Sequence, residues 1–196
     1  MLLLLDIDGV LLQAGPDFRE SMLLDTGWKG DDQSFFEKLF KCEEYLATLE
    51  GRRDFEDFID SFIALNGSPC EVKSFMRWWC HPLSPNLDLI RCVRKFTSSK
   101  VGLASNQEKY RAAAILNGLI PYLPVDYVFL SFELGAAKPS RSFFEQVLSQ
   151  SGYAPHEVTF VDDSAANVEV AMEMGINSVL FHENRQTIGA LERTCV

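Results

Sequence analysis

The chain opens with a short apolar run that ends in two carboxylates. Residues 2–5 are four leucines, and Asp6, Asp8 and Gly9 follow within four positions. The run is too short for a helix and stops at a turn residue, so it predicts a short buried strand. A strand that served packing alone would not end in two acids, because an unpaired buried carboxylate is costly. Ligands of doubly wound α/β folds bind just beyond the carboxyl ends of the strands, so the opening predicts a functional site there.

Strand-like and helical segments alternate from about residue 85 onward. Further strands are predicted at 100–104, 127–130, 158–161 and 178–181, and helices at 86–97, 108–116, 141–151, 166–174 and from about 186. Such alternation indicates βαβ units and a parallel sheet. With residues 2–5 as a central strand, the expected fold class is α/β with a doubly wound parallel sheet.

A helical segment interrupts this α/β pattern after the first strand. Its apolar residues recur three and four apart, as in Phe55, Phe58 and Phe62, which is the spacing of one helix face. No convincing strand pattern occurs in it. We therefore expect residues 14–85 to form a small helical domain inserted into a core made of residues 1–13 and 86–196. Turn-forming residues near 13–16 and 81–85 predict hinges.

Composition and charge exclude several classes of function. The 196 residues carry a net charge of −10, which disfavours binding to nucleic acid and to anionic membranes. No run of 18 apolar residues is present, and the leucine run lacks the basic flank of a signal peptide. Five scattered cysteines without a CxxC pair fit reduced thiols better than disulfides or a zinc site. We expect a cytoplasmic protein.

Polar residues follow four of the predicted strands, and parallel strands bring such positions to one edge of a sheet. The set comprises Asp6, Asp8, Ser105, Asn106, Lys138, Asp162, Asp163 and Asn167. Clustered carboxylates repel one another and raise each other's pKa, so a positive centre has to offset them. Oxygen ligands without His or Cys favour a hard cation such as Mg²⁺, which readily shares phosphate oxygens. Lys138 and Ser105 would supply further phosphate contacts.

These segments resemble the haloacid dehalogenase superfamily. The DxDGV opening, the Ser-Asn pair, the Lys-Pro pair and the Asp-Asp-Ser-x-x-Asn turn match its four motifs in order. The match covers the core, and the insert resembles the helical cap of one subfamily. The resemblance implies a Rossmann-like core with a cap that acts as a lid, and a Mg²⁺-dependent phosphatase acting on a small phosphorylated metabolite. Sugar phosphates and nucleoside monophosphates both stay open as substrates.

The resemblance also implies a role for each site residue. Asp6 matches the nucleophile that forms an aspartyl-phosphate, and Asp8 matches the general acid/base. Ser105 and Lys138 match the phosphate-binding hydroxyl and lysine, and Asn106 and the backbone near Gly9 are further expected substrate contacts. The implied metal ligands are Asp6, Asp163, Asp162 and the backbone carbonyl of Asp8.

The sequence is also compatible with other roles for these residues and with other functions. Ser105 and Asn106 could cap the next helix, Asp162 could be a structural cap, and Lys138 could be an ordinary surface residue. A phosphomutase or phosphotransferase would use the same motifs, and a non-enzymatic phosphate-binding protein could retain the scaffold. A dehalogenase is less expected, because members that break carbon–halogen bonds generally lack the acid found here at Asp8.

Overall fold

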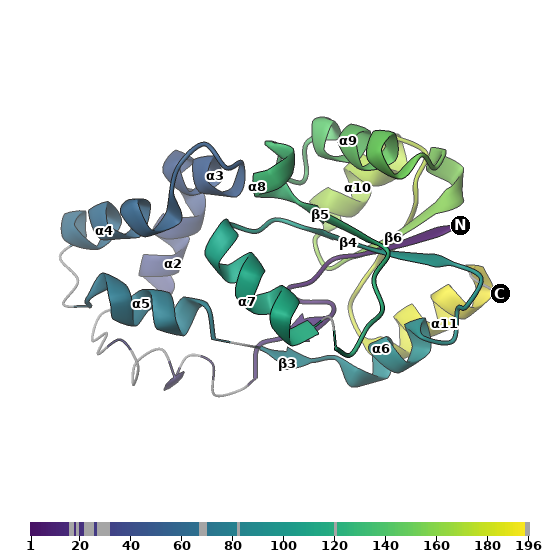
Figure 1. Cartoon of the computed structure of the whole chain (residues 1–196), viewed down its shortest axis with the longest axis horizontal. Coiled ribbons are helices and arrows are strands. Elements are labelled where there is room, and N and C mark those ends of the chain that lie inside the picture. Colours follow the sequence, from purple (N-terminus) through teal and green to yellow (C-terminus); the bar gives the residue numbers. More distant parts are fainter. Residues whose placement is uncertain are drawn as a thin grey trace.

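The four leucines form β1 (Leu2–Leu5), the central strand of a five-stranded parallel sheet in the computed structural model (Figure 1). The described residues are 1–15, 18, 20–21, 26, 32–66, 70–81, 83–119 and 121–194. The strand order is β5-β4-β1-β6-β7, formed by β4 (Lys100–Ser105), β5 (Tyr127–Leu130), β6 (Val158–Asp162) and β7 (Asn177–Leu180). Along the chain, β4 and β5 are added on one side of β1, and β6 and β7 are then added on the other. This order confirms the doubly wound α/β fold.

Helices cover both faces of this sheet. Successive side chains of a strand point to opposite faces. Leu3 and Leu5 lie in one apolar cluster with residues of α6 (Leu87–Val93), α7 (Lys109–Leu119) and α11 (Asn184–Thr194). Leu2 and Leu4 lie in another with residues of α9 (Arg141–Ser151) and α10 (Ala165–Glu173). A strand buried on both faces is apolar at every position, which explains the uninterrupted leucine run.

The structure differs from the sequence prediction mainly at the ends of elements. β4 and β6 each continue one residue further than expected, because Ser105 pairs with Leu130 and Asp162 pairs with Leu180. A short helix α8 (Ser131–Leu134) follows β5, and a single 3₁₀ turn η1 (Pro155–Glu157) precedes β6. None of the described helices has both the length and the apolar character needed to cross a membrane.

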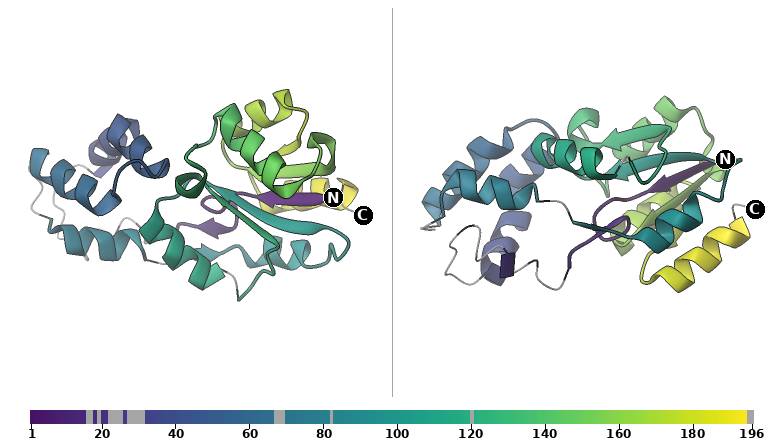
Figure 2. Two further views of the ribbon diagram at one scale, coloured as in Figure 1. Left: turned by 45° about the horizontal axis from the view of Figure 1, so that its top comes forward. Right: turned by 60° about the horizontal axis from the view of Figure 1, so that its bottom comes forward.

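Four helices of the insert gather at one end of the sheet, away from both termini (Figures 1 and 2). They are α2 (Asp32–Lys41), α3 (Glu43–Leu49), α4 (Phe55–Leu65) and α5 (Val72–Trp79). Their buried side chains form a separate, largely aromatic cluster that includes Phe55, Phe75, Trp78 and Trp79. The helices of this segment therefore have an apolar core of their own.

The two connections to these helices run side by side. β2 (Leu12–Gln13) pairs with β3 (Ser84–Pro85) in an antiparallel ribbon. The sequence did not predict this ribbon, because strands of two residues are too short to show an alternating pattern. Part of each segment expected to be a hinge is thus paired, while Pro16 and Pro82 lie outside the described residues.

Candidate functional site

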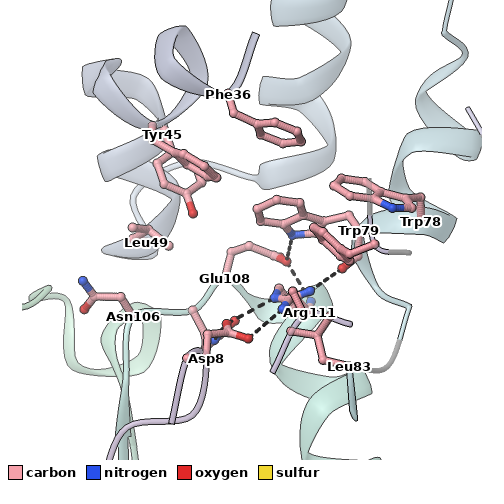
Figure 3. A pocket seen from close by; sticks show the side chains of 15 residues that line it. Asp8, Phe36, Tyr45, Leu49, Trp78, Trp79, Leu83, Asn106, Glu108 and Arg111 are labelled. Carbon is pink, nitrogen blue, oxygen red and sulfur yellow. Dashed lines mark hydrogen bonds and ion pairs between the residues drawn. The ribbon is translucent and has the colours of Figure 1, made fainter. Parts of the chain in front are cut away.

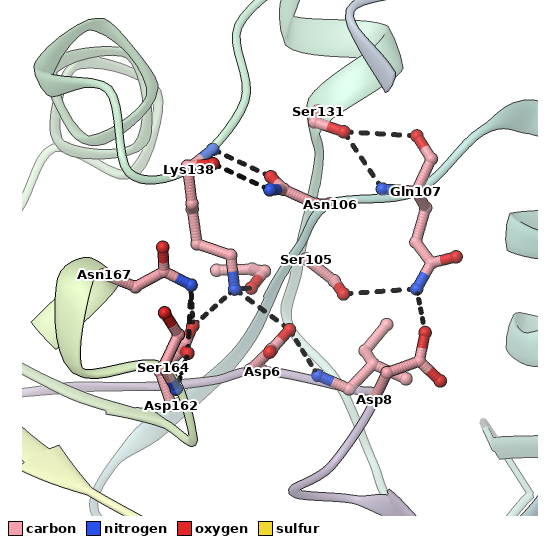
Figure 4. Close-up of polar contacts among 12 residues, drawn as sticks. Asp6, Asp8, Ser105, Asn106, Gln107, Ser131, Lys138, Asp162, Ser164 and Asn167 are labelled. Atoms are coloured by element: carbon pink, nitrogen blue, oxygen red, sulfur yellow. Dashed lines mark hydrogen bonds and ion pairs between the residues drawn. The ribbon is translucent and has the colours of Figure 1, made fainter. Parts of the chain in front are cut away.

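The carboxyl ends of the central strands surround a cavity of about 340 Å³ (Figure 4). Asp6 follows β1 directly, Ser105 ends β4, and Lys138 comes from the loop between α8 and α9. The cavity is lined by Asp6, Asp8, Gly9, Ser105, Asn106, Lys138, Asp163 and Asn167. Asp162 ends β6 and is fully buried beside Lys138. The structure therefore brings together all the site residues expected from the sequence.

Lys138 is a buried charge and not a surface residue. Its side chain is 1% exposed, and Nζ lies 3.0 Å from Asp6 Oδ1 and 2.6 Å from Asp162 Oδ2. Nζ also donates to the carbonyl oxygen of Ala104 at 2.8 Å. Burial alone would lower the pKa of Lys138, but the two aspartates outweigh it and the pKa lies above its usual value. These three partners use all three ammonium protons, so Lys138 holds Asp6 in place as well as supplying charge.

Asp6 is the second member of this buried charge cluster. Asp6 is 7% exposed. Its Oδ1 accepts a hydrogen bond from the Ile7 amide at 2.7 Å and also contacts Lys138 Nζ. Burial raises the pKa of Asp6, Lys138 lowers it and Asp162 raises it again, to about 6 in total. The carboxylate is therefore ionised above that pH, and its fixed orientation suits a nucleophile at the edge of the cavity.

The raised pKa of Asp6 makes the stability of the metal-free protein depend on pH. The folded-state pKa of about 6 exceeds the ordinary value of 3.8. The folded protein therefore binds the proton more tightly than the unfolded chain, and stability falls as the pH rises between those values. Asp6→Asn removes this charge. We expect the free energy of unfolding of this variant to gain about 1–2 kcal/mol over that of the wild type between about pH 5 and about pH 8. This is roughly half of the effect of the full pKa shift.

Urea denaturation with a chelator at both pH values measures this difference. Asp60→Asn, which changes an exposed aspartate of α4, is the matched control and should show no such trend. An advantage of Asp6→Asn that is equal at both pH values would contradict the raised pKa.

Asn106 holds the backbone of Lys138. Its Nδ2 donates to the Lys138 carbonyl at 2.8 Å, and its Oδ1 accepts the Lys138 amide at 2.8 Å. Its side chain thus positions Lys138, and Asn106 also lines the cavity, so its contact with substrate stays a prediction.

The interpretation of Ser105 and Asn106 as caps of the next helix is wrong, because Glu108 accepts the Tyr110 and Arg111 amides at the start of α7.

Three carboxylates could hold a metal ion. Among the described residues, Asp6, Asp162 and Asp163 each offer an oxygen within 4.8 Å of the others. Asp162 Oδ1 also accepts the Ser164 amide at 2.8 Å and Asn167 Nδ2 at 3.0 Å, so Asp162 has the structural role considered above as well. Three acids against one lysine leave an excess of negative charge, and oxygen-only donors suit a hard cation. The residues present therefore fit Mg²⁺.

Gly9 permits the close approach of Asp163. Its φ is +82°, a conformation that favours glycine, and a Cβ at this position would lie 2.1 Å from Asp163 Oδ2. Its amide donates to the Leu12 carbonyl at 2.8 Å. The N–H of Gly9 itself is therefore engaged, and the residue shapes the site through its missing side chain, while a substrate contact from the backbone near Gly9 stays a prediction.

Asp8 has a different set of neighbours from Asp6, and two of them were missed by the sequence analysis. Arg111 Nη2 lies 2.7 Å from Asp8 Oδ1, and Gln107 Nε2 donates to Asp8 Oδ2 at 2.6 Å (Figures 3 and 4). The side chain of Asp8 is 37% exposed. Gln107 directly follows the Ser-Asn pair and precedes α7, and Arg111 lies in the first turn of α7. No local pattern in the sequence indicated which carboxylate either side chain would face.

Arg111 and Glu108 also tie α7 to α5. Trp79 Nε1 donates to Glu108 Oε1 at 3.0 Å, and Arg111 Nη1 donates to the Trp79 carbonyl at 2.6 Å. The guanidinium lies 5.3 Å from the centre of the Trp79 ring. Burial raises the pKa of Glu108, while the bonds from Tyr110, Arg111 and Trp79 oppose that rise. A residue that orients Asp8 is therefore held by a helix of the insert.

Comparisons with solved structures find the same fold in other proteins. Solved structures that share the fold include a HAD family enzyme from Bacteroides thetaiotaomicron, 24% identical with a TM-score of 0.75 over 92% of each chain. A complex of that enzyme with magnesium and inorganic phosphate has a TM-score of 0.73 at 23% identity, over 92% of this chain and 93% of the other. The L-2-haloacid dehalogenase from Xanthobacter autotrophicus has a TM-score of 0.70 at 20% identity, over 98% and 82%.

Curated relatives match over shorter stretches. The chain is 34% identical over 53 residues to D-ribitol-5-phosphate phosphatase of Bacteroides thetaiotaomicron, which covers 27% of this chain and 26% of that protein. It is 41% identical over 58 residues to drimenol cyclase drtB of Aspergillus calidoustus, which covers 30% and 11%. These matches span about a quarter or less of each relative. The sequence model for haloacid dehalogenase-like hydrolases matches residues 1–175, and the chain therefore belongs to that family.

Proposed function

We propose that this protein is a Mg²⁺-dependent phosphatase that hydrolyses a small phosphomonoester through an aspartyl-phosphate on Asp6. The observation that carries the proposal is the presence of two carboxylates with separate supports at one cavity. Asp6 is held by Lys138, whereas Asp8 is held by Arg111 and Gln107. Different surroundings allow two acids to do different work, one as nucleophile and one as proton carrier.

In the first step, an Asp6 oxygen attacks phosphorus while the bond between phosphorus and the ester oxygen breaks. Asp8 gives its proton to the departing oxygen, which leaves as an alcohol. Lys138 and the Ser105 hydroxyl lie at the same cavity, where negative charge on the phosphoryl oxygens has to be met.

In the second step, water attacks the phosphorus of the aspartyl-phosphate and gives a proton to Asp8. The bond from Asp6 to phosphorus breaks, which releases inorganic phosphate and restores both acids. A Mg²⁺ held by Asp6, Asp162 and Asp163, with the Asp8 backbone carbonyl, would supply charge stabilisation to the phosphoryl group.

Three observations favour this proposal over its alternatives. A relative in the family is a D-ribitol-5-phosphate phosphatase, and a family member of the same fold was solved with magnesium and phosphate. Asp8 at the cavity favours phosphoryl chemistry over dehalogenation, in which no such proton carrier is expected.

A panel of phosphomonoesters, assayed with Mg²⁺ and with a chelator, tests the proposal. We expect release of inorganic phosphate that depends on Mg²⁺. Isomerised sugar phosphate in place of free phosphate would indicate a mutase. No turnover of any ester, combined with no thermal stabilisation by Mg²⁺ and beryllium fluoride, would overturn the proposal.

Arg111→Lys tests whether Arg111 positions the proton carrier. Lysine keeps the charge, but its single ammonium cannot serve both Asp8 and the Trp79 carbonyl as the planar guanidinium does. We expect kcat to fall by about 10–100-fold, the size of effect that a misplaced catalytic group produces. Arg91→Lys, at an exposed arginine paired with Asp88, is the control. Equal kcat in the two variants would contradict the positioning role.

We further propose that residues 14–85 form a cap domain on a core of residues 1–13 and 86–196, and that the cap selects the substrate. The separate apolar cluster of its helices and the ribbon of β2 and β3 support this division. We also propose a cytoplasmic location, since all four described cysteines are free thiols and Cys195 lies outside the described residues.

A further inference from the structure

A second, larger cavity lies between the insert and the core (Figure 3). Its volume is about 480 Å³, and its wall is mainly apolar. Aromatic side chains from three helices of the insert line it, among them Phe36 and Phe40 of α2, Tyr45 of α3, and Trp78 and Trp79 of α5. A mainly apolar wall with few polar groups is typical of a pocket for a small organic ligand.

This cavity borders the catalytic cavity at Asp8, the proposed proton carrier. Asp8, Gly9 and Asn106 line both. In the proposed reaction, the alcohol leaves from the side on which Asp8 stands. A substrate whose phosphoryl group sits beside Asp6 and Lys138 would therefore extend its alcohol part past Asp8 and between the aromatic side chains.

The charged groups of the wall are already engaged. Arg111 binds Asp8 and the Trp79 carbonyl, and Glu108 accepts bonds from Trp79 and two backbone amides. Gln107 donates to Asp8 and Ser105. Among the labelled side chains of Figure 3, Tyr45 points its hydroxyl into the open space, and Trp78 Nε1 is a buried donor without a hydrogen-bond partner among the described residues. A ligand with many hydroxyls would leave most of them without partners, which is costly.

We propose that this pocket binds the leaving group, and that the preferred substrates are monophosphates of apolar alcohols, aromatic or branched aliphatic, rather than of polyols. The proposal rests on the phosphatase function and adds the substrate class. An apolar cavity of about 150 Å³ holds benzene, so a cavity three times as large has room for a substituted ring or a short branched chain. The pocket thus differs in chemistry from what a ribitol phosphate requires.

The test compares three esters of primary alcohols, whose leaving groups have similar intrinsic reactivity. They are 2-phenylethyl phosphate, ethyl phosphate and D-ribitol 5-phosphate. We expect kcat/KM for 2-phenylethyl phosphate to exceed that for D-ribitol 5-phosphate by about 100-fold and that for ethyl phosphate by about 10-fold or more. An equal or higher kcat/KM for D-ribitol 5-phosphate would overturn the proposed substrate class while leaving the phosphatase function intact.

A binding measurement separates the pocket from the chemistry. Calorimetry with Mg²⁺ compares 2-phenylethylphosphonate and ethylphosphonate, which cannot be hydrolysed. We expect about 10-fold tighter binding of the phenyl compound. If no ester is hydrolysed but this preference is found, the phosphatase proposal fails and the pocket assignment stands. Equal affinities would overturn the pocket assignment whatever the activity.

Matched variants test whether the aromatic pocket produces the preference for the phenyl compound. Phe40 is 52% exposed and lines the pocket, so Phe40→Asn should fold. We expect it to reduce the ratio of the two phosphonate affinities by about fivefold. Leu65→Asn, at an 86% exposed apolar residue of α4 away from the pocket, should leave the ratio unchanged. Equal ratios in the two variants would contradict the proposed site.

Discussion

Asp6→Asn is expected to lower kcat by at least about 10⁴-fold, the largest effect of any single substitution proposed for this protein. An amide is a poor nucleophile, so the aspartyl-phosphate cannot form. The substitution is nearly isosteric, and its side-chain oxygen can still accept the Ile7 amide and the Lys138 ammonium. The loss should therefore arise from chemistry and not from unfolding. Phosphate release with Mg²⁺, together with a thermal unfolding curve, measures both.

The control for this experiment is Asp60→Asn, which should keep full activity. Mass spectrometry of acid-quenched wild-type enzyme during turnover should find phosphate on the peptide that contains Asp6. If Asp6→Asn retains more than about a tenth of wild-type kcat, another residue or water is the nucleophile and the proposed mechanism is wrong.

Asp8→Asn is expected to lower kcat by about 10²–10⁴-fold, the usual contribution of a positioned acid or base. The rates of the two chemical steps should fall by different amounts for different esters. Because 4-nitrophenolate leaves without a proton, the first step with 4-nitrophenyl phosphate should keep most of its rate. The second step still needs Asp8 to take a proton from water, so the aspartyl-phosphate should accumulate.

Rapid mixing tests this expectation. Asp8→Asn should release about one equivalent of 4-nitrophenolate per enzyme in a burst, followed by slow turnover. With 2-phenylethyl phosphate, whose alkoxide needs protonation, no burst should occur. Equal losses on both esters without a burst would show that Asp8 does not carry the proton, and would leave it a structural partner of Arg111.

Much of the site could be predicted because parallel sheets bring strand ends to one edge. Asp6, Ser105 and Asp162 each lie at the end of a buried strand, and the apolar runs that mark those strands are local features of the sequence. The fold class followed from the same runs. Their roles came from the resemblance of four short motifs, which is also local. Nothing long-range was needed to place these residues together.

Side-chain partners could not be predicted in the same way. Sequence alone did not show that the Asn106 side chain hydrogen-bonds the backbone of Lys138, 32 positions away, or that the Gly9 amide donates to the Leu12 carbonyl. Hydrogen bonds depend on distances of a few tenths of an ångström, and those are set by how whole elements pack. Arg111 was passed over because an arginine on a helix gives no signal of which carboxylate it faces.

The sequence by itself determined the doubly wound sheet, the edge at which the acids gather and the helical character of the insert, because each depends on periodicity or on position relative to a strand end. Only the tertiary structure decided which charges neutralise one another, and that Trp79 joins the insert to α7. It alone also formed the aromatic pocket beside Asp8. That pocket lies between segments far apart in the chain, and a cavity between packed helices leaves no pattern in the sequence of any one of them.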